Sequence, residues 1–530
     1  MKKTFLIAAG LAAALMASTV QAKTLVYCSE GSPEGFDPAL YTAGTTFDAS
    51  SKPIYNRLVE FENGTTKVIP GLAESWTVSD DGLELTFKLR PGVKFHSNDV
   101  FTPTRDFNAD DVVFTFERQL KEDNPWNKYT EGTAWEYFNA MDMPTLIKEI
   151  VKVDDMTVKF VLNRPEAPIV ANMAMDFASV LSKEYADKLA GMDAMADLNQ
   201  KPIGTGPFAF VAYQKDAVIR YRAHDGYWGE KPKIDDLIFA ITTDNSVRAQ
   251  KLKAGECQIA PYPNPADIPA LQADPNLQVM EQEGLNVGYL AYNTRVAPFD
   301  NRDVRKALNM AINKQAILDA VFDGAGKAAK NPIPPTMWSY NEATVDDPYD
   351  PEAARKMLAE AGVSDLKMKI WAMPVARPYN PNARRMAELL QDDFGKIGVD
   401  VEIVSYEWGE YLKLSKALDR DGAILLGWTG DNGDPDNFLA VLLSCSAVGA
   451  SNRAQWCNEE FDKLTNQAKQ ISDQAERSKL YVEAQEVFKR EAPWATIAHS
   501  VVFMPMSTKV SGYKMDPLGG HRFDSVDLAE

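Results

Sequence analysis

Residues 366–406 read LKMKIWAMPVARPYNPNARRMAELLQDDFGKIGVDVEIVSY and carry the clearest signal for the fold. Leu366–Met373 and Val399–Val404 are short apolar runs that predict two buried strands. Between them, Asn382–Ile397 predicts an amphipathic helix whose apolar face holds Met386, Leu389, Leu390, Phe394 and Ile397. Gly398 stands where a helix C-cap belongs. A strand, a helix and a strand in this order indicate two parallel strands joined by a crossover. The chain is therefore predicted to have an α/β fold.

Two loops that follow predicted strands carry charges of opposite sign. The segment WAMPVARPYNPNARR (371–385) places Arg377 four residues beyond the first strand. A further buried strand is predicted at Ala423–Gly427, and GWTGDNGDPDNF (427–438) places Asp431 four residues beyond its end. Ligands of open α/β sheets bind beyond the carboxyl ends of the strands. A cation and an anion held there would suit a small ligand with opposite charges at its two ends, such as a free peptide.

Each of these charges also has a simpler interpretation. Arg377 could be an ordinary surface cation, but three prolines in the segment 371–385 stiffen its loop and lower the entropy lost on binding a carboxylate. An arginine suits that task because its planar fork can donate two parallel hydrogen bonds. Asp431 could be a turn residue between glycine and asparagine. Trp428 is an unusual choice for a plain turn and a good wall for a binding cleft.

The N-terminus has the layout of a secretory signal peptide. Basic residues at positions 2 and 3 precede an apolar run, and Val20-Gln21-Ala22 predicts cleavage after residue 22. The apolar run is shorter than the roughly 20 residues that span a bilayer. Removing the segment 1–22 leaves 508 of 530 residues, too many for one core, and takes the net charge from −19 to −21. Such an acidic chain is not expected to bind nucleic acid or anionic lipid.

The four cysteines predict two disulfides rather than a metal site. No pair of them has the C-x-x-C spacing of zinc or redox sites, and an exported chain with an even count favours disulfides. Four cysteines allow three pairings. We favour Cys445–Cys457, which closes a local loop, and this leaves Cys28–Cys257, which would tie the N-terminal strand to a segment far along the chain.

Periodicity predicts the remaining elements. Strands are expected at Thr24–Cys28, Leu83–Arg90, Thr157–Leu162, Ala217–Arg222, Leu237–Thr243 and Asn286–Asn293. Helices are expected at Asn108–Leu120, with Asn108 as N-cap, and at Val304–Ile312, Asn458–Ile471 and Gln474–Glu491.

Motifs of catalysis and of metal binding are missing from the sequence. The four histidines lack metal-ligand spacing, and there is no G-x-S-x-G nucleophile motif. The acidic string at Asp431, Asp434 and Asp436 lacks the Gly and the Glu of an EF-hand, although a non-standard calcium loop stays open. We therefore predict a protein that is not an enzyme, with no catalytic residues, no metal and no cofactor.

Many segments resemble the substrate-binding proteins of peptide ABC transporters, within the wider peptide and nickel binding class. The resemblance covers the whole mature chain and includes LVYCSEGSPEGFDPAL, IPGLAESW, FNADDVVFTFERQ, PIGTGPF, GLNVGYLAYN and DPLGGHRF. The segments WAMPVARPYNPNARRMAE and GWTGDNGDPDNF resemble the dipeptide-binding branch in particular.

The resemblance implies an α/β fold of two lobes that close about a hinge, with an extra domain inserted in the first lobe. By that pattern lobe I takes residues 23–55, 202–283 and 499–530, the extra domain takes 56–201, and lobe II takes 284–498. The predicted Cys28–Cys257 bridge would then lie inside lobe I.

The resemblance also implies a binding site for the two ends of a dipeptide. Arg377 would hold the ligand carboxylate and Asp431 the ligand ammonium. Backbone groups of Thr42-Ala43-Gly44, Pro378-Tyr379 and Trp428-Thr429-Gly430 would bond the peptide as added strands. The implied protein is a periplasmic monomer that delivers dipeptides to an inner-membrane permease. Haem, nickel, glutathione or a longer oligopeptide on the same fold is the alternative, although nickel would need better-placed histidines.

Overall fold

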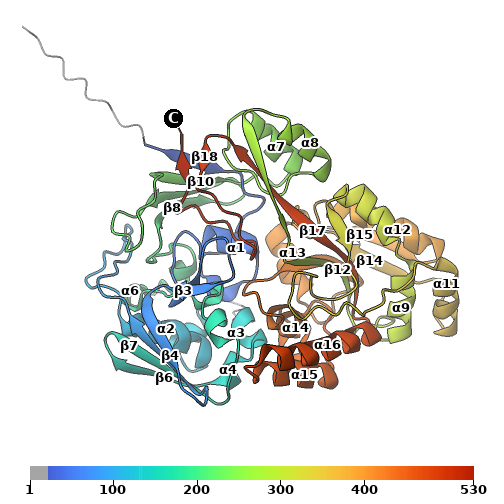
Figure 1. The fold of residues 1–530 in the computed structure, drawn as a ribbon, viewed down its shortest axis with the longest axis horizontal. Coiled ribbons are helices and arrows are strands. Elements are labelled where there is room, and N and C mark those ends of the chain that lie inside the picture. Colours follow the sequence, from blue (N-terminus) through green and yellow to red (C-terminus); the bar gives the residue numbers. More distant parts are fainter. Residues whose placement is uncertain (1–21, 131, 133, 530) are drawn as a thin grey trace, which may run out of the picture.

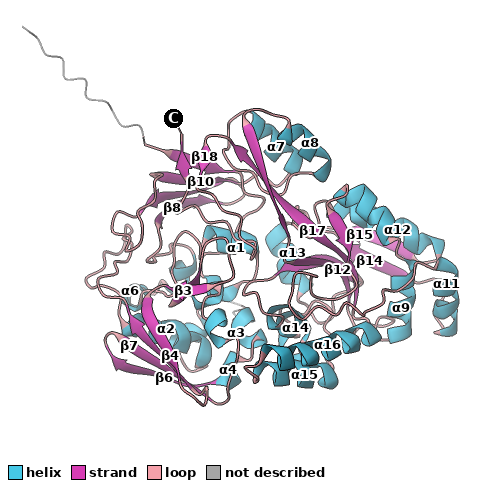
Figure 2. Ribbon diagram, viewed as in Figure 1, coloured by secondary structure: helices cyan, strands magenta, loops and turns pink. Residues whose placement is uncertain are grey.

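The computed structural model describes residues 22–130, 132 and 134–529 (Figure 1). The predicted signal peptide, except for Ala22, lies outside the described residues. Within the described part of the chain, no helix has the length and apolar character needed to cross a membrane. Every strand and helix predicted above is present, with ends that agree to within three residues. Helices and strands alternate over much of the chain, as an α/β fold requires (Figure 2).

A four-stranded sheet contains the first strand of the described chain. Its order is β1-β10-β9-β8, with β1 parallel to β10 and the other neighbours antiparallel. The bounds are β1 Thr24–Tyr27, β8 Phe208–Gln214, β9 Val218–Ala223 and β10 Asp236–Ala240. The Cys28–Cys257 disulfide follows directly after β1, and Cys445 pairs with Cys457, so the structure contains the pairing that we favour.

A second, antiparallel sheet of four strands lies within residues 73–162. Its order is β4 (Ala73–Val78), β5 (Glu84–Leu89), β7 (Thr157–Leu162) and β6 (Ile147–Asp154). Helix α2 (Ala109–Leu120) packs against β6 and β7.

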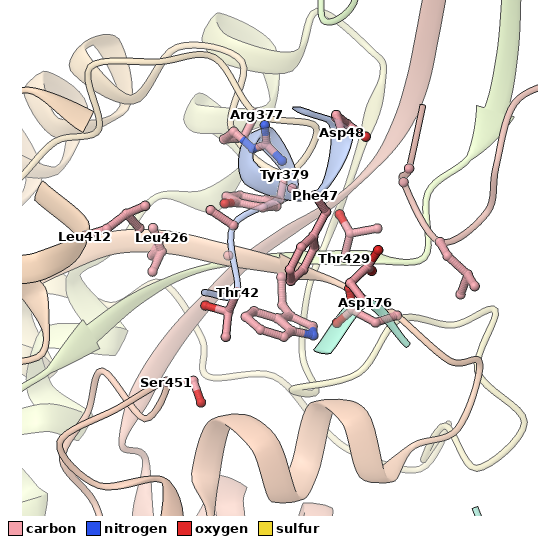
Figure 3. Close-up of a pocket in the computed structure, with 18 of the residues that line it drawn as sticks. Thr42, Phe47, Asp48, Asp176, Arg377, Tyr379, Leu412, Leu426, Thr429 and Ser451 are labelled. Carbon is pink, nitrogen blue, oxygen red and sulfur yellow. The ribbon is translucent and has the colours of Figure 1, made fainter. Parts of the chain in front are cut away.

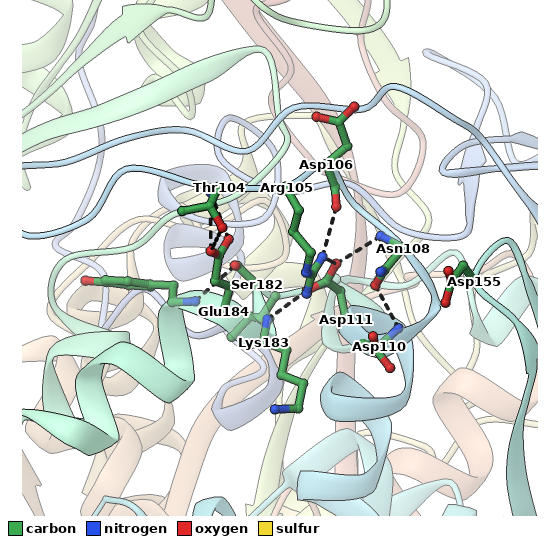
Figure 4. A network of polar contacts seen from close by, with 12 residues as sticks. Thr104, Arg105, Asp106, Asn108, Asp110, Asp111, Asp155, Ser182, Lys183 and Glu184 are labelled. Atoms are coloured by element: carbon green, nitrogen blue, oxygen red, sulfur yellow. Dashed lines mark hydrogen bonds and ion pairs between the residues drawn. The ribbon is translucent and has the colours of Figure 1, made fainter.

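The start of α2 is fixed by the cap that the sequence predicts. The Asn108 side chain accepts a hydrogen bond from the Asp110 amide, and the Asp111 carboxylate accepts one from the Asn108 amide (Figure 4). Asp111 also pairs with Arg105 and accepts from the Lys183 amide, which joins α2 to α6 (Lys183–Gly191). One buried carboxylate thus caps a helix and holds its neighbour in place.

The third sheet has seven strands and carries the predicted crossover. Its order is β11-β17-β12-β16-β14-β15, with β13 paired to β17. The bounds are β11 Leu277–Glu283, β12 Asn286–Tyr292, β13 Gly326–Ala328, β14 Lys367–Trp371, β15 Asp400–Val404, β16 Ala423–Thr429 and β17 Trp494–Ser507. β14 is parallel to both β15 and β16, and helix α12 (Ala383–Lys396) joins β14 to β15. The predicted strand, helix and strand unit is confirmed.

The remaining elements surround these sheets. The strands are β2 Val59–Phe61, β3 Val68–Pro70, β18 Val510–Ser511 and β19 Asp527–Leu528. The helices are α1 Gly44–Ala49, α3 Glu136–Ala140, α4 Met143–Leu146, α5 Ile169–Asn172, α7 Asn245–Lys253, α8 Ile268–Gln272, α9 Arg302–Ala311, α10 Lys314–Ile317, α11 Pro351–Glu360, α13 Trp408–Ser415, α14 Asp436–Leu443, α15 Glu459–Lys469 and α16 Gln474–Glu491.

Strand β17 is a single run of 14 residues that links two regions of the molecule. Its C-terminal half pairs with β11, and its N-terminal half pairs with β12 and β13. In Figure 1 it runs from the region of α7 and α8 into the sheet of β12 and β14. The predicted lobe boundary after residue 283 falls between β11 and β12, and the predicted boundary before residue 499 falls within β17. Both boundaries stay predictions.

Candidate functional site

A cavity with an empty volume of about 760 Å³, part of it open to solvent, lies beyond the carboxyl ends of β14 and β16. Because these strands are parallel, the loops that leave them meet at the same edge of the sheet. Arg377, Tyr379, Thr429 and Thr42 all lie around the cavity (Figure 3). Eight of the ten predicted ligand-binding residues line it: Thr42, Ala43, Gly44, Arg377, Tyr379, Trp428, Thr429 and Asp431. The two predicted charges therefore share one cavity.

Arg377 is buried at one side of this cavity. Its guanidinium forms an ion pair with Glu30, and its Cζ lies 5.3 Å from the ring centroid of Tyr262. Burial disfavours the charge, but Tyr262 and Glu30 outweigh that effect and raise the pKa of Arg377. The side chain is therefore a permanent cation, and it keeps further donors for a second acceptor.

Close backbone packing fixes the loop that carries Arg377. A Cβ on Gly288 would lie 2.4 Å from the Tyr379 carbonyl oxygen, and one on Gly427 would lie 2.2 Å from the Tyr379 ring. Strands β12 and β16 thus need glycine at these two positions so that the loop can lie flat against the sheet. The Ser500 hydroxyl donates to the Pro378 carbonyl at 2.5 Å, which anchors the loop from β17.

Asp431 is half-buried at another side of the cavity. Its carboxylate accepts a hydrogen bond from the Tyr137 hydroxyl. Its amide donates to the Asn437 side chain at 2.8 Å, and the Trp428 indole donates to the same oxygen at 3.0 Å. Burial raises the pKa of Asp431 to about 7, although the Tyr137 hydrogen bond acts to lower it. An ammonium group placed here would restore the ionised form.

Two predicted residues stand behind the cavity wall. The Gly430 amide donates to the Leu285 carbonyl at 2.9 Å, and the Pro378 carbonyl is held by Ser500. Neither residue lines the cavity. Their backbone roles, like the ligand-binding roles of the other eight residues, stay predictions.

Two partners of the charged pair, Glu30 and Tyr137, are not among the predicted site residues. Glu30 lies three residues beyond the end of β1, so the same strand-end argument could have found it. Tyr137 lies on α3, far from Asp431 in the sequence, and no local pattern indicates it. The cavity wall also holds an ion pair between Lys52 and Asp176, 2.8 Å apart.

The acidic string after β16 is engaged in protein contacts. Asp434 pairs with Arg477 at 2.8 Å and accepts from the Asp436 amide at 3.0 Å. In the portion of the chain that the structure describes, no group of three or more His, Cys, Asp or Glu side chains could hold a metal ion. The string therefore gives no support to a calcium loop.

Comparison with known families identifies the family to which this fold belongs. Residues 67–450 match the family model of the bacterial extracellular solute-binding proteins, family 5. The chain belongs to this family.

Particular relatives are similar over nearly their whole length. The "Dipeptide-binding protein" of Escherichia coli K12 is 56% identical over 534 residues, which covers 100% of this chain and 99% of the relative. "Heme-binding protein A" of Haemophilus influenzae is 50% identical over 506 residues, which covers 95% and 92%. A crystal structure of the dipeptide binding protein from Pseudoalteromonas sp. SM9913 in complex with Met-Leu matches with a TM-score of 0.93 and 40% identity, covering 96% of this chain and 100% of that one. The predicted two-lobed α/β fold of this class is confirmed.

Proposed function

We propose that this protein captures free dipeptides by their two charged ends and delivers them to an ABC transporter permease. The single observation that carries the proposal is the presence of Arg377 and Asp431 at two parallel strand ends of one cavity. Arg377 would bind the ligand carboxylate and Asp431 the ligand ammonium.

The surroundings of the two charges support this assignment. Arg377 is 7% exposed, so that a carboxylate bound to it would be shielded from water. Charge–charge interactions strengthen as water is removed. Asp431 is mostly protonated below pH 7 without a ligand, and an ammonium is the group that would stabilise its charge.

The separation of the two charges would select ligands by length. A free amino acid would leave one of the two charges without its partner, at a cost of several kcal/mol. A longer peptide would have to place a third residue between the same two side chains. Because main chain and termini provide the contacts, many side chains would be accepted.

The cellular setting follows from the family and the N-terminus. A family of extracellular solute-binding proteins and a predicted signal peptide support a periplasmic location. The relatives that are named for dipeptide binding support a dipeptide as ligand. The loaded protein would dock as a monomer on an inner-membrane permease.

Haem is the second candidate because one relative is named for haem binding. Haem iron is held by histidine, cysteine, methionine or tyrosine side chains. Among the described residues that line the cavity, the only side chains of this kind are tyrosines, Tyr289 and Tyr379. Haem would then be held by a tyrosine or by the apolar part of the cavity wall, and its affinity would not depend on Asp431.

Calorimetric titration of ligand-stripped protein tests the proposal. The ligands are Ala-Ala, N-acetyl-Ala-Ala, Ala-Ala-amide, Ala-Ala-Ala and haem, each with wild type, Arg377→Met and Asp431→Asn. Arg384→Met and Asp392→Asn are matched controls, because these side chains are exposed on α12. We expect tight binding of Ala-Ala that either blocked terminus and either cavity variant abolishes, with both controls unchanged. Binding that ignores both cavity variants would refute the two-ended site.

A further inference from the structure

A second buried guanidinium lines the same cavity and has no role in the function proposed above. The side chain of Arg453 is buried, and its Nη1 donates to the Ala450 carbonyl. Its Nε has no hydrogen-bond partner. Arg453 forms no ion pair with any residue that the structure describes, whereas Arg377 has Glu30. A buried cation without a counter-ion is costly, so an anion from outside the chain would stabilise it.

A second unpartnered donor lies in the same wall. Tyr289 on β12 is buried and lines the cavity, and its hydroxyl has no hydrogen-bond partner. Its ring stacks on Trp494 with centroids 3.9 Å apart, which fixes the direction of the hydroxyl. Burial raises the pKa of Tyr289, and the nearby Arg453 charge acts in the opposite direction. The tyrosine therefore stays protonated at neutral pH and can donate.

The carboxylates of Glu34 and Glu136 do not form an ion pair with Arg453. Glu34 interacts with the Arg453 charge, but burial raises the pKa of Glu34 to about 7, so a large part of it is protonated at neutral pH. Glu136 is already paired with Lys416. Neither Glu34 nor Glu136 lines the cavity.

We infer that Arg453 and Tyr289 form a subsite for an acidic side chain of the bound peptide. This inference rests on the proposed function, because it assumes that a dipeptide occupies the cavity between Arg377 and Asp431. A carboxylate can accept from a guanidinium and a phenol together. Arg453 and Tyr289 both line the cavity, and the Arg453 Nε and the Tyr289 hydroxyl have no hydrogen-bond partner. Ser451, which also lines the cavity, adds a further polar group beside them. The ligands that fit best are dipeptides containing Glu or Asp.

Matched dipeptide pairs test this inference by calorimetry at pH 7.5. Ala-Glu is compared with Ala-Gln, and Glu-Ala with Gln-Ala, because each pair differs only in the charge of one side chain. We expect wild type to bind the glutamate member of at least one pair about tenfold more tightly, as one charge-assisted hydrogen bond would give. Arg453→Gln should abolish this preference and leave the affinity for Ala-Ala within about threefold. Tyr289→Phe should reduce the preference while it keeps the ring stack.

The outcomes separate the two proposals. Failure of Ala-Ala to bind wild type would overturn the proposed function itself. Binding of Ala-Ala without a preference in either pair would overturn the acidic subsite alone. Equal losses for Ala-Ala and Ala-Glu in Arg453→Gln would also overturn it, because the arginine would then hold the peptide terminus or the fold. The wild-type comparison needs no variant, and Tyr289→Phe serves if Arg453→Gln does not fold.

Discussion

Acidification should weaken dipeptide binding through Asp431. Its pKa of about 7 in the ligand-free cavity means that half of the carboxyl groups are ionised at pH 7.0 and about 3% at pH 5.5. Only the ionised form can pair with an ammonium, so the affinity for Ala-Ala should fall about 15-fold over this range. This factor corresponds to about 1.6 kcal/mol of binding free energy.

The sign of the effect follows from linkage. The folded pKa of Asp431 lies above its unfolded value, so this group favours the folded protein at low pH and ceases to do so as the pH rises through 7. A bound ammonium favours the carboxylate and lowers that pKa again. Ala-Ala should therefore release close to one proton on binding at pH 6. At pH 8 Asp431 is already mostly ionised and releases almost none, whereas the ligand amine, about half of it neutral at that pH, takes up about half a proton.

Three of the four histidines, His96, His499 and His521, stay neutral in this pH range. Burial lowers the pKa of His96 to about 3 and that of His499 and His521 to about 4, and it also lowers the pKa of His224. The ligand ammonium, with a pKa near 8, is protonated throughout the range from pH 5.5 to 7.0.

Calorimetry in two buffers of different ionisation enthalpy measures both the affinity and the number of protons released. Wild type is titrated with Ala-Ala from pH 5.5 to 7.0, and Asp431→Asn is titrated beside it at higher protein concentration. The asparagine variant should bind weakly with little dependence on pH. An affinity of wild type that stays constant over this range, or an equal slope in the variant, would refute the assignment of Asp431 as the ammonium ligand.

Three further changes test the scaffold and the site. Replacing both cysteines of the Cys28–Cys257 bridge by serine should lower the free energy of unfolding in urea by about 5 kcal/mol, because this bridge spans 229 residues. The same change at Cys445–Cys457, which spans 12 residues, should lower it by about 3 kcal/mol. Equal losses would contradict this ordering. Gly288→Ala should lower the free energy of unfolding by about 1–3 kcal/mol and bind Ala-Ala more weakly, because its methyl would lie 2.4 Å from the Tyr379 carbonyl oxygen. The control Gly395→Ala meets no neighbour and should retain full affinity. Tyr137→Phe removes a donor to the carboxylate at the ammonium end and should weaken Ala-Ala binding by about 3–10-fold in calorimetry; tighter binding would mean that the hydroxyl competes with the ligand.

Local sequence patterns predicted the elements and the strand ends well. The helix at 383–396 begins after Asn382 and ends before Gly398, because its apolar spacing, its cap and its terminal glycine all lie within a few residues of each other. Arg377 and Asp431 could be placed in one site for the same reason, since each follows a short apolar strand. The parallel pairing of those strands brings the two loops to one edge.

Contacts between distant segments could not be predicted in this way. Glu30 and Arg377 are 347 residues apart in the chain, and Tyr137 and Asp431 are 294 apart. No periodicity connects such residues, because their approach depends on how whole sheets are placed. Arg453 was missed for a related reason: only the structure shows that it lacks a counter-ion.

The long strand β17 determines how the molecule can open. Strand β17 is hydrogen-bonded to β11 at one end and to β12 and β13 at the other. Moving the region of β11 away from the region of β12 and β13 would therefore bend a continuous hydrogen-bonded strand. Any separation of the two regions would therefore be a bending of this shared strand, and the register of the β17 pairs would set how the two regions meet again.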